Sequence, residues 1–277
     1  MIWNYINVRI NANETSQKVS ILDRVLINVK SLSSHFNRTK KIQAQIAAYK
    51  TTKECYIIGN GPSINRLKWS IINEFDTFGV NAVYLLQPEI KKIPTYYVIE
   101  DVYVAEDRKD EIMNFKRGEI EIYPNYLKYL FKGKSNALFV NVFFYYGRLF
   151  KPRVGKSIDH GLFVGGSVSH LCIQLAIHLG YKKIHIVGMD HNYVVHDTVK
   201  STGVKIFSTK DDDPNHFSPK YFGKGKRWHE PNMERMERTH DYLNTVARKK
   251  NVVIYNCFEG SGLKSYPICD LHDVYLK

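Results

Sequence analysis

Short apolar runs alternate with helix-like segments over most of the chain. The apolar runs predict strands at residues 55–58, 77–80, 95–99, 183–187 and 252–255, with residues 138–146 as a strand or a buried loop. Helical patterns predict helices at residues 64–73, 108–115, 167–179 and 231–249. Strands that alternate with helices are typical of an α/β fold with a doubly wound, mostly parallel sheet, which is the architecture that we expect.

One long stretch departs from this alternation. Residues 191–228 are polar, contain glycine and proline, and have few periodic apolar positions. Long connections without secondary structure of their own are uncommon in compact domains and are often functional. We therefore expect a long functional loop or lid in this region.

The first fifty residues are basic and amphipathic. They contain eight basic and two acidic residues, a net charge of +6. Some of their apolar residues recur at helical spacing: Val19, Leu22, Leu26 and Val29. We expect residues 1–50 to form a helical appendage that packs on the main domain, pairs with a second copy, or docks on an anionic membrane. Residues 51–277 are the predicted main domain.

The composition is that of a basic globular protein. The 277-residue chain has 40 Lys and Arg against 27 Asp and Glu, a net charge of +13, which favours a polyanionic partner. No apolar run reaches the roughly 18 residues of a membrane-spanning helix, and residues 1–10 lack a secretory pattern. The four cysteines form no Cys-x-x-Cys pair, which predicts reduced thiols and a cytoplasmic protein.

A glycine-rich turn follows the first predicted strand, with the sequence Gly59-Asn60-Gly61-Pro62-Ser63. Such a turn lets a ligand approach the backbone, and a helix N-terminus behind it attracts a phosphate. Ile64 stands where a dinucleotide fingerprint has its third glycine, and Asn81 stands where it has an acidic residue for the ribose. We therefore expect a mononucleotide rather than NAD, bound by Asn60, Ser63 and Asn81. The alternative is a structural turn without a ligand.

Polar residues also follow other predicted strands. Asn81, Asp101 and Asp190 stand at strand ends, which share one edge in a parallel sheet. We expect these side chains to converge on the ligand, although each would also suit a turn or a cap. Gly166 and Ser167, at the start of a predicted helix, form a second candidate anion site or a plain helix cap.

Residues 213–229 interleave histidines, cations and aromatic side chains. His229 or His216 would serve as a general base near neutral pH. Three cations of this stretch would neutralise a leaving phosphate: Lys224, Lys226 and Arg227. A basic aromatic loop also suits RNA, and a solvated surface loop is the plain alternative.

The sequence gives little support for a catalytic metal. It contains eleven histidines but no His-Glu-x-x-His motif and no paired His/Cys spacing. The three aspartates at residues 211–213 are more typical of a solvated charge run than of a cation site. We therefore expect no metal.

Several of these motifs resemble the bacterial sialyltransferases that modify lipooligosaccharide. The resemblance rests on the turn at 59–63, the strand end Phe78-Gly79-Val80-Asn81, and residues 176–190, which close with Gly188-Met189-Asp190. It implies a single Rossmann-like domain that uses CMP-sialic acid without a metal. The turn, the helix entry Gly165-Gly166-Ser167-Val168 and the Gly-x-Asp strand end are also similar to the 6-hydroxymethylpterin diphosphokinase-like family.

The sialyltransferase resemblance implies roles for individual residues. It implies nucleotide contacts from the turn and the second strand end: Asn60, Gly61, Pro62, Ser63 and Asn81. Asp101 falls where the family has a donor-binding Asn, and His229 matches its general-base His. Tyr193 lies near a Tyr that steadies the leaving phosphate, and His196 replaces the second such Tyr. Tyr221, from the aromatic stretch, is a further candidate for the leaving phosphate.

The leading expectation is a glycosyltransferase that moves a sugar acid from a CMP-sugar donor to a cell-surface glycan or glycolipid, with a His base and no cofactor. The departures from the family pattern admit another sugar acid, such as Kdo. One alternative is a diphosphokinase-like phosphotransferase with Mg²⁺ held by Glu100, Asp101 and Asp190, and another is a basic nucleotide- or RNA-binding module. We expect a self-associating cytoplasmic protein, either free or peripheral at the inner membrane face, without nucleic acid as a partner.

Overall fold

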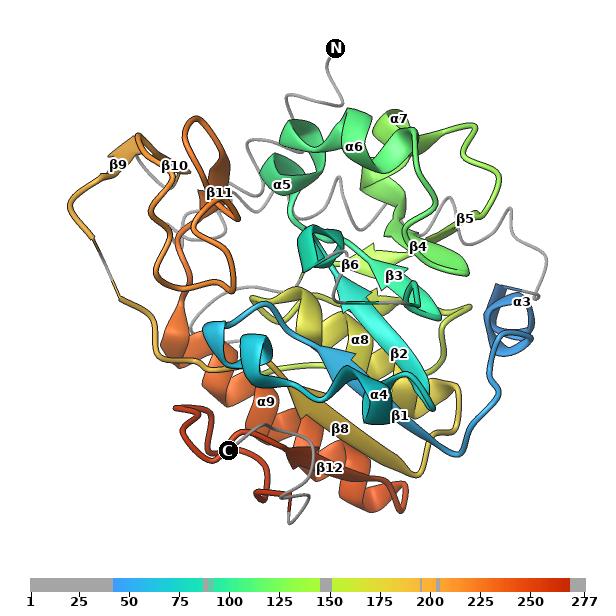
Figure 1. Cartoon of the computed structure of the whole chain (residues 1–277). Helices are drawn as coiled ribbons and strands as arrows, with labels where there is room; N and C mark the ends of the chain where they lie inside the picture. The colour runs from blue at the N-terminus through green and yellow to red at the C-terminus, as the bar shows by residue number, and fades with distance from the viewer. Residues whose placement is uncertain are drawn as a thin grey trace.

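The computed structural model describes residues 42–269, except 87–89, 91, 145–150, 195 and 203–204. Its centre is a seven-stranded sheet in which all neighbouring strands are parallel, in the order β12-β8-β1-β2-β3-β4-β5 (Figure 1). The strands are β1 (Glu54–Ile58), β2 (Asp76–Val80), β3 (Tyr96–Val98), β4 (Ile120–Pro124), β5 (Ala137–Val140), β8 (Lys183–Val187) and β12 (Val253–Asn256). This arrangement confirms the expected α/β fold with a doubly wound, parallel sheet.

Two long helices pack on this sheet. They are α8 (Val168–His178), which contacts β1, and α9 (Met233–Lys249), which contacts β12 and α8. Residues 169–177 of α8 are all buried, because the apolar side chains of this helix are not confined to one side. The remaining elements are short: η1 (Pro62–Arg66), α4 (Trp69–Ile72), η2 (Val83–Leu86), α5 (Val102–Asp107), α6 (Lys109–Met113), η3 (Asn125–Leu127), α7 (Lys128–Phe131), β6 (Val142–Phe143) and β7 (Leu162–Phe163).

The strand order reverses at β1, and this reversal fixes where a ligand can bind. From β1 the chain continues through β2, β3, β4 and β5 on one side, then returns to β8 on the other side of β1. Open α/β sheets bind ligands beyond the carboxyl ends of the strands that flank such a reversal. In this chain those ends are the turns after Ile58 and Val187 (Figure 1).

Two elements differ from the prediction for identifiable reasons. Residues 64–73 are not one helix, because Leu67 between η1 and α4 is extended, with a ψ of 140°. The pattern does not predict β4, since Glu121 interrupts its apolar run. Glu121 is fully buried, where it accepts a hydrogen bond from Arg117 N (2.7 Å) and pairs with Lys134 Nζ (3.4 Å).

The predicted lid contains regular structure. Its strands β9 (Val199–Thr202), β10 (Lys205–Ser208) and β11 (Arg227–His229) form an antiparallel sheet, and β11 packs against α5 (Figure 1). Phe222 stacks on Trp228 with 4.4 Å between the ring centroids, and both side chains are buried. The aromatic residues that made this stretch unusual are therefore buried, and they join the hydrophobic core of the main domain.

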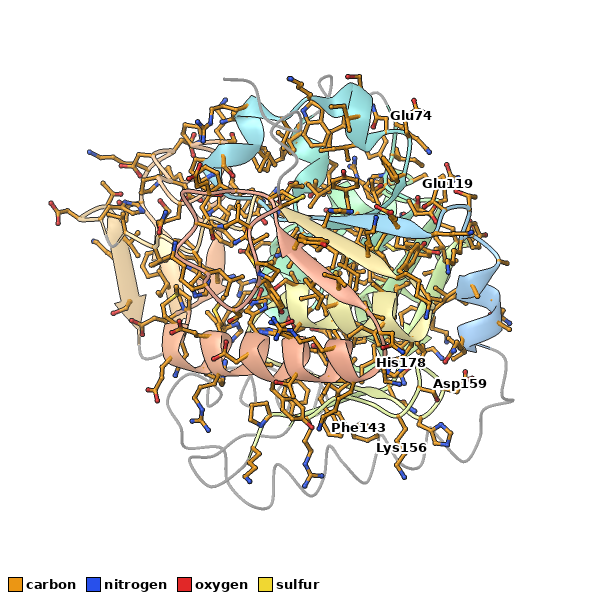
Figure 2. All side chains as sticks on the ribbon, turned by 90° about the horizontal axis from the view of Figure 1, so that it is seen from below. Glu74, Glu119, Phe143, Lys156, Asp159 and His178 are labelled. Atoms are coloured by element: carbon orange, nitrogen blue, oxygen red, sulfur yellow. The ribbon has the colours of Figure 1, made fainter. Side chains whose placement is uncertain are left out.

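The first 41 residues, which hold most of the predicted appendage, lie outside the described residues. The remainder includes α3 (Ile42–Ala47), whose Ile46 is fully buried. Gln43 of this helix donates from its backbone amide to Asp159 Oδ1 and from its side chain to His178 O, both at 3.1 Å. Figure 2 labels Asp159 and His178. This last part of the appendage therefore packs on the main domain. Within the described part of the chain, every helix is too short or too polar to cross a membrane.

Candidate functional site

A cavity of about 510 Å³ opens at the carboxyl ends of β1 and β8, where the strand order reverses. Its wall contains most of the residues predicted from the sequence: Asn60, Gly61, Pro62, Asn81, Asp101, Gly166, Ser167, Asp190, Tyr193, His216, Tyr221 and His229. Five predicted residues lie outside this wall: Ser63, His196, Lys224, Lys226 and Arg227. The side chains expected at the strand ends thus meet in one cavity, whereas the expected phosphate-binding cations do not reach it.

His229 and Asp101 form a hydrogen-bonded pair on this wall. His229 Nδ1 lies 2.8 Å from Asp101 Oδ2, and the ring stacks on Tyr103 with 4.4 Å between centroids. Asp101 is also the N-cap of α5, because its Oδ1 accepts from the amides of Tyr103 (2.7 Å) and Val104 (3.3 Å). These fixed bonds hold the carboxylate, and through it the imidazole, in one orientation.

The charge of Asp101 determines which ring nitrogen of His229 carries the proton. Burial alone would raise the pKa of Asp101, but the His229 ring and the two amides outweigh burial and lower the pKa below its usual value. An ionised carboxylate can only accept, so Nδ1 of His229 donates to it. In the neutral ring Nε2 is then the proton acceptor, which is the arrangement of a carboxylate-oriented general base.

His216, on the same wall, forms a second histidine–carboxylate pair with Asp213. His216 Nδ1 is 2.7 Å from Asp213 Oδ2, and the ring stacks on Tyr221 at 4.0 Å between centroids. Asp213 also accepts from the amides of Asn215 (2.9 Å) and Phe222 (3.1 Å). Burial would raise the pKa of Asp213, but its bond to His216 and these amides lower it. The geometry therefore offers two candidate bases.

The glycines of the turn at 59–63 allow this turn to pack closely against the turn after β8. A Cβ on Gly59 would lie 2.3 Å from Gly188 O, and one on Gly61 would lie 2.6 Å from Asp190 Cγ. The Gly61 amide donates to Gly188 O (2.7 Å), so the turns after β1 and β8 are bonded to each other. The glycines permit this close packing of two turns, which brings Asn60 and Asp190 to the same cavity.

Asp190 fills the place that the sequence suggested for a phosphate. Its Oδ2 accepts from the Ser63 amide (2.9 Å), and its Oδ1 accepts from the Ser63 hydroxyl. The first turn of η1 thus already holds a carboxylate. Ser63 is buried behind the wall, so its contact is with the protein rather than with the cavity.

The two asparagines of the wall present hydrogen-bond acceptors. Asn60 donates from Nδ2 to Val80 O (3.2 Å) and to the Tyr221 hydroxyl (2.9 Å), which fixes its amide. Asn81 has a positive φ of 50°, a conformation that asparagine tolerates better than most residues. Among the described residues, nothing donates to the buried Oδ1 of Asn60 or of Asn81. Buried acceptors of this kind suit the amino or hydroxyl groups of a ligand.

Two of the three expected cations pair with carboxylates of α5 and α6 instead of facing the cavity. Arg227 Nε donates to Asp107 Oδ1 (2.8 Å), and Lys226 Nζ lies 3.4 Å from Glu111 Oε1. Among the described residues that form the wall, Arg235 from the first turn of α9 is the only lysine or arginine. The sequence analysis missed Arg235. Its only signal is its place at the start of the helix that follows His229.

The remaining predicted residues of the wall make local contacts. Ser167 is the N-cap of α8 and accepts from the Ser169 amide (3.4 Å), while Gly166 has a φ of 95° and passes close to Arg235. The Tyr193 hydroxyl accepts from Trp228 Nε1 (3.2 Å). Gly166 therefore makes room for the Arg235 side chain at the cavity.

Comparisons with known proteins find both resemblances seen in the motifs. The model of a family described as 6-hydroxymethylpterin diphosphokinase MptE-like matches residues 88–196, less than half of the chain. No curated protein matches the chain by sequence.

Solved glycosyltransferase structures resemble the fold at low sequence identity. The MAf glycosyltransferase from Magnetospirillum magneticum AMB-1 is 14% identical with a TM-score of 0.51, and the match covers 86% of this chain and 39% of that one. The monofunctional alpha-2,3-sialyltransferase Cst-I from Campylobacter jejuni is 15% identical, with a TM-score of 0.49 and coverage of 78% and 80%. The sialyltransferase CstII from Campylobacter jejuni, solved with CMP-3FNeuAc, is 15% identical, with a TM-score of 0.44 and coverage of 82% and 89%. The chain thus has a Rossmann-like α/β fold shared with the MAf glycosyltransferase, and its motifs resemble both sialyltransferases and MptE-like proteins.

Proposed function

We propose that the protein is a glycosyltransferase that moves a sugar acid, sialic acid or a Kdo-like sugar, from a CMP-sugar to a glycan acceptor. The observation that carries the proposal is the His229–Asp101 pair on the wall of the cavity at the strand-order reversal. The motif resemblance supplies the identity of the donor. In this proposal the acceptor is a cell-surface glycan or glycolipid, reached from the cytoplasmic side of the membrane.

The nucleotide occupies the part of the cavity formed by the turn after β1. Asn60 and Asn81 offer amide oxygens to the amino and hydroxyl groups of a nucleoside. The cavity volume of about 510 Å³ lies within the roughly 300–1,000 Å³ of small-molecule sites. Gly61 and Pro62, which also form the wall, present no long side chain to this part of the cavity.

Arg235 binds the anionic part of the donor. A CMP-sugar acid carries a phosphate and a carboxylate, and a guanidinium can bind either group through two parallel hydrogen bonds. Arg235 takes the role that the sequence assigned to Lys226 and Arg227, whose side chains pair with carboxylates of α5 and α6. Tyr193 and Tyr221 line the same cavity and remain candidates for steadying the leaving phosphate.

The reaction requires one proton transfer and one substitution at the anomeric carbon of the sugar. Nε2 of His229 takes the proton of the acceptor hydroxyl as its oxygen forms a bond to the anomeric carbon of the sugar. The bond between that carbon and the phosphate oxygen breaks, and CMP leaves with the electron pair. Asp101, which bonds to Nδ1, stabilises the imidazolium that forms. Arg235 offsets the charge that develops on the phosphate.

Release of CMP tests this function directly. The purified full chain is incubated with CMP-sialic acid or CMP-Kdo, with and without a glycan acceptor, and free CMP is measured. CMP alone, without a divalent cation, should raise the melting temperature, whereas ATP with Mg²⁺ or a short RNA should not. No CMP release from either donor, together with stabilisation by ATP and Mg²⁺ only, would contradict the proposal.

A phosphotransferase is the second candidate, because the MptE-like family model matches residues 88–196. The carboxylates of Glu100, Asp101 and Asp190 line the cavity and are the groups that would hold Mg²⁺. Asp101 bonds to His229 and Asp190 bonds to Ser63, so protein groups already engage these carboxylates. The geometry therefore favours the glycosyltransferase, and formation of AMP from ATP and Mg²⁺ in the presence of a pterin alcohol would reverse that preference.

A further inference from the structure

A cluster of metal-ligand side chains lies outside the cavity. His185 Nδ1 is 3.9 Å from Cys257 Sγ and 3.8 Å from Cys269 Sγ, and the three ligand atoms all lie within 4.8 Å of one another. His185 and Cys257 are buried, and Cys269 is half-buried. Both cysteines are thiols rather than partners in a disulfide. No step of the proposed reaction uses these three residues.

The fold assembles this cluster from three separate segments. His185 lies in the middle of β8, and Cys257 follows β12, the strand next to it. Further along the chain, Ile268 forms a parallel β-bridge with Asn256, the last residue of β12. Cys257 and Cys269 are the residues that directly follow the two members of this bridge. Sequence spacing gives no sign of such a site, because the ligands stand 72 and 84 positions from His185.

The imidazole is held with Nδ1 toward the two thiols. Its other nitrogen, Nε2, lies 3.0 Å from Glu54 Oε2 on β1. The ring stacks on Tyr56 at 4.9 Å and on Tyr255 at 5.6 Å between centroids. A histidine that ligates a metal usually donates its second ring N–H to a carboxylate or carbonyl, and Glu54 occupies that position here.

We propose that His185, Cys257 and Cys269 bind a zinc ion. With Zn–S near 2.3 Å and Zn–N near 2.0–2.1 Å, tetrahedral geometry places ligand N and S about 3.6 Å apart, close to the separations seen here. Two thiolates and a neutral imidazole balance the charge of Zn²⁺ and are the soft ligand set that this metal prefers. Three protein ligands leave the fourth position for water or another group.

A disulfide between the two cysteines accounts for less of the cluster. It would leave aside His185, whose Nδ1 lies near both thiols. A metal ion includes all three side chains.

The zinc ion has a structural role in this inference. The chain between its cysteine ligands forms part of the cavity and its support: Phe258 lines the wall, Ser261 Oγ donates to Met189 O (2.7 Å), and the Gly262 amide donates to Asp190 O (2.8 Å). A metal that joins Cys257 and Cys269 to β8 would fix this segment behind the turn that carries Asp190. The proposal does not depend on which reaction the cavity catalyses.

Cobalt substitution tests the site in the full chain. The protein is purified under reducing conditions, stripped with a chelator and titrated with Co²⁺, which reports thiolate ligation by a charge-transfer band in the near ultraviolet. We expect saturation at one equivalent, displacement of the band by Zn²⁺, and its loss in Cys257→Ser and Cys269→Ser. Cys172→Ala, which removes a buried thiol from α8, should keep the band. The absence of the band in the reduced wild-type protein would overturn the proposal, as would a Cys257–Cys269 disulfide in the mass spectrum of the untreated protein.

The carboxylate behind His185 provides a second test that leaves all three ligands intact. Glu54→Gln should weaken Co²⁺ affinity about 10–100-fold, the usual effect of losing such a partner. The matched control is Lys183→Met, because Lys183 Nζ contacts the same carboxylate at Oε1 (2.8 Å) but not the imidazole. Equal affinities for wild type and Glu54→Gln would show that Glu54 does not support a metal-bound His185.

Discussion

At the scale of single residues, His229 and His216 differ mainly in what holds their carboxylate partners. Asp101 caps a helix and is fixed by two helical amides, whereas Asp213 is fixed by amides of the surrounding loop. A base must be held in position as well as deprotonated, and helices hold side chains more firmly than loops do. This difference, together with the motif resemblance, favours His229 as the base.

Substitution of the two histidines separates their roles. His229→Ala should lower turnover with the CMP-sugar by roughly 10²–10⁴-fold, the usual contribution of a general base, and leave CMP affinity nearly unchanged. His216→Ala is the matched control, because it removes the same ring from the other His–Asp pair of the wall. Turnover is measured by CMP release and affinity by calorimetry. If His216→Ala had the larger effect on turnover, the base would be His216.

The residues of the cavity show what a sequence can and cannot predict. Asn60, Asn81, Asp101 and Asp190 were predictable because strand ends meet at one edge of a parallel sheet. Arg235 was missed, since its place in the first turn of the helix after His229 was its only signal.

Interactions with distant carboxylates explain why Lys226 and Arg227 were predicted to face the cavity but do not. Lys226 and Arg227 stand near His229 in sequence, and this position suggested a phosphate-binding role. Their partners Asp107 and Glu111 lie more than a hundred positions away, and these carboxylates turn both cations away from the cavity.

At the scale of elements, the strands were the easiest to predict. Parallel strands are buried on both faces, so β1 and β8 appear in the sequence as mainly apolar runs, although His185 stands in the middle of β8. β4 was missed because a buried Glu121 breaks its run, and the antiparallel sheet of 199–229 was missed because its strands are short and polar. In both cases long-range contacts, rather than local pattern, decide the structure.

A buried carboxylate joins the start of the main domain to β2. Asp76 accepts from the amides of Thr51 (2.8 Å) and Thr52 (3.0 Å) and from the Tyr181 hydroxyl (2.6 Å). Burial would raise the pKa of Asp76, but these bonds outweigh it and lower the pKa. A carboxyl with a lowered folded-state pKa adds stability above its unfolded pKa, and that stability is lost as the pH falls through the folded pKa.

Asp76→Asn should therefore destabilise the fold in a pH-dependent way. At pH 7 we expect the free energy of unfolding to fall by about 1–3 kcal/mol, because buried donors lose a charged acceptor. The difference from wild type should shrink as the pH falls below about 4, the unfolded pKa of Asp. Urea unfolding at a series of pH values measures both quantities.

A surface carboxylate is the control for this measurement. Glu119, labelled in Figure 2, pairs with Lys116 at the protein surface, so Glu119→Gln should change stability by only about 0–1 kcal/mol. If the difference in the free energy of unfolding between wild type and Asp76→Asn stayed constant down to the acid transition, the charge of Asp76 would not contribute to stability.

At the scale of the whole molecule, charge is unevenly distributed along the chain. Residues 1–41 hold seven basic and two acidic residues, a net charge of +5 out of +13 for the chain. Only the last part of the predicted appendage, residues 42–50, belongs to the described structure, where it packs on the domain through Gln43 and Ile46. A test of the appendage should therefore spare this part, because its removal would expose the buried Ile46 site.

Deletion of residues 1–41 distinguishes an accessory role from a catalytic one. The deletion leaves α3 and every described residue of the cavity in place, so CMP affinity should not change. The basic, helically spaced residues of 1–41 predict self-association or attachment to an anionic membrane. The truncated chain should therefore have a lower mass in solution by light scattering, or should bind less to vesicles that contain anionic lipid.

Vesicles of neutral lipid are the control, because attraction of basic residues requires a negative surface. If the truncation changed neither mass nor vesicle binding, both predicted roles of the appendage would be wrong, and a loss of CMP affinity would instead assign it to the nucleotide site.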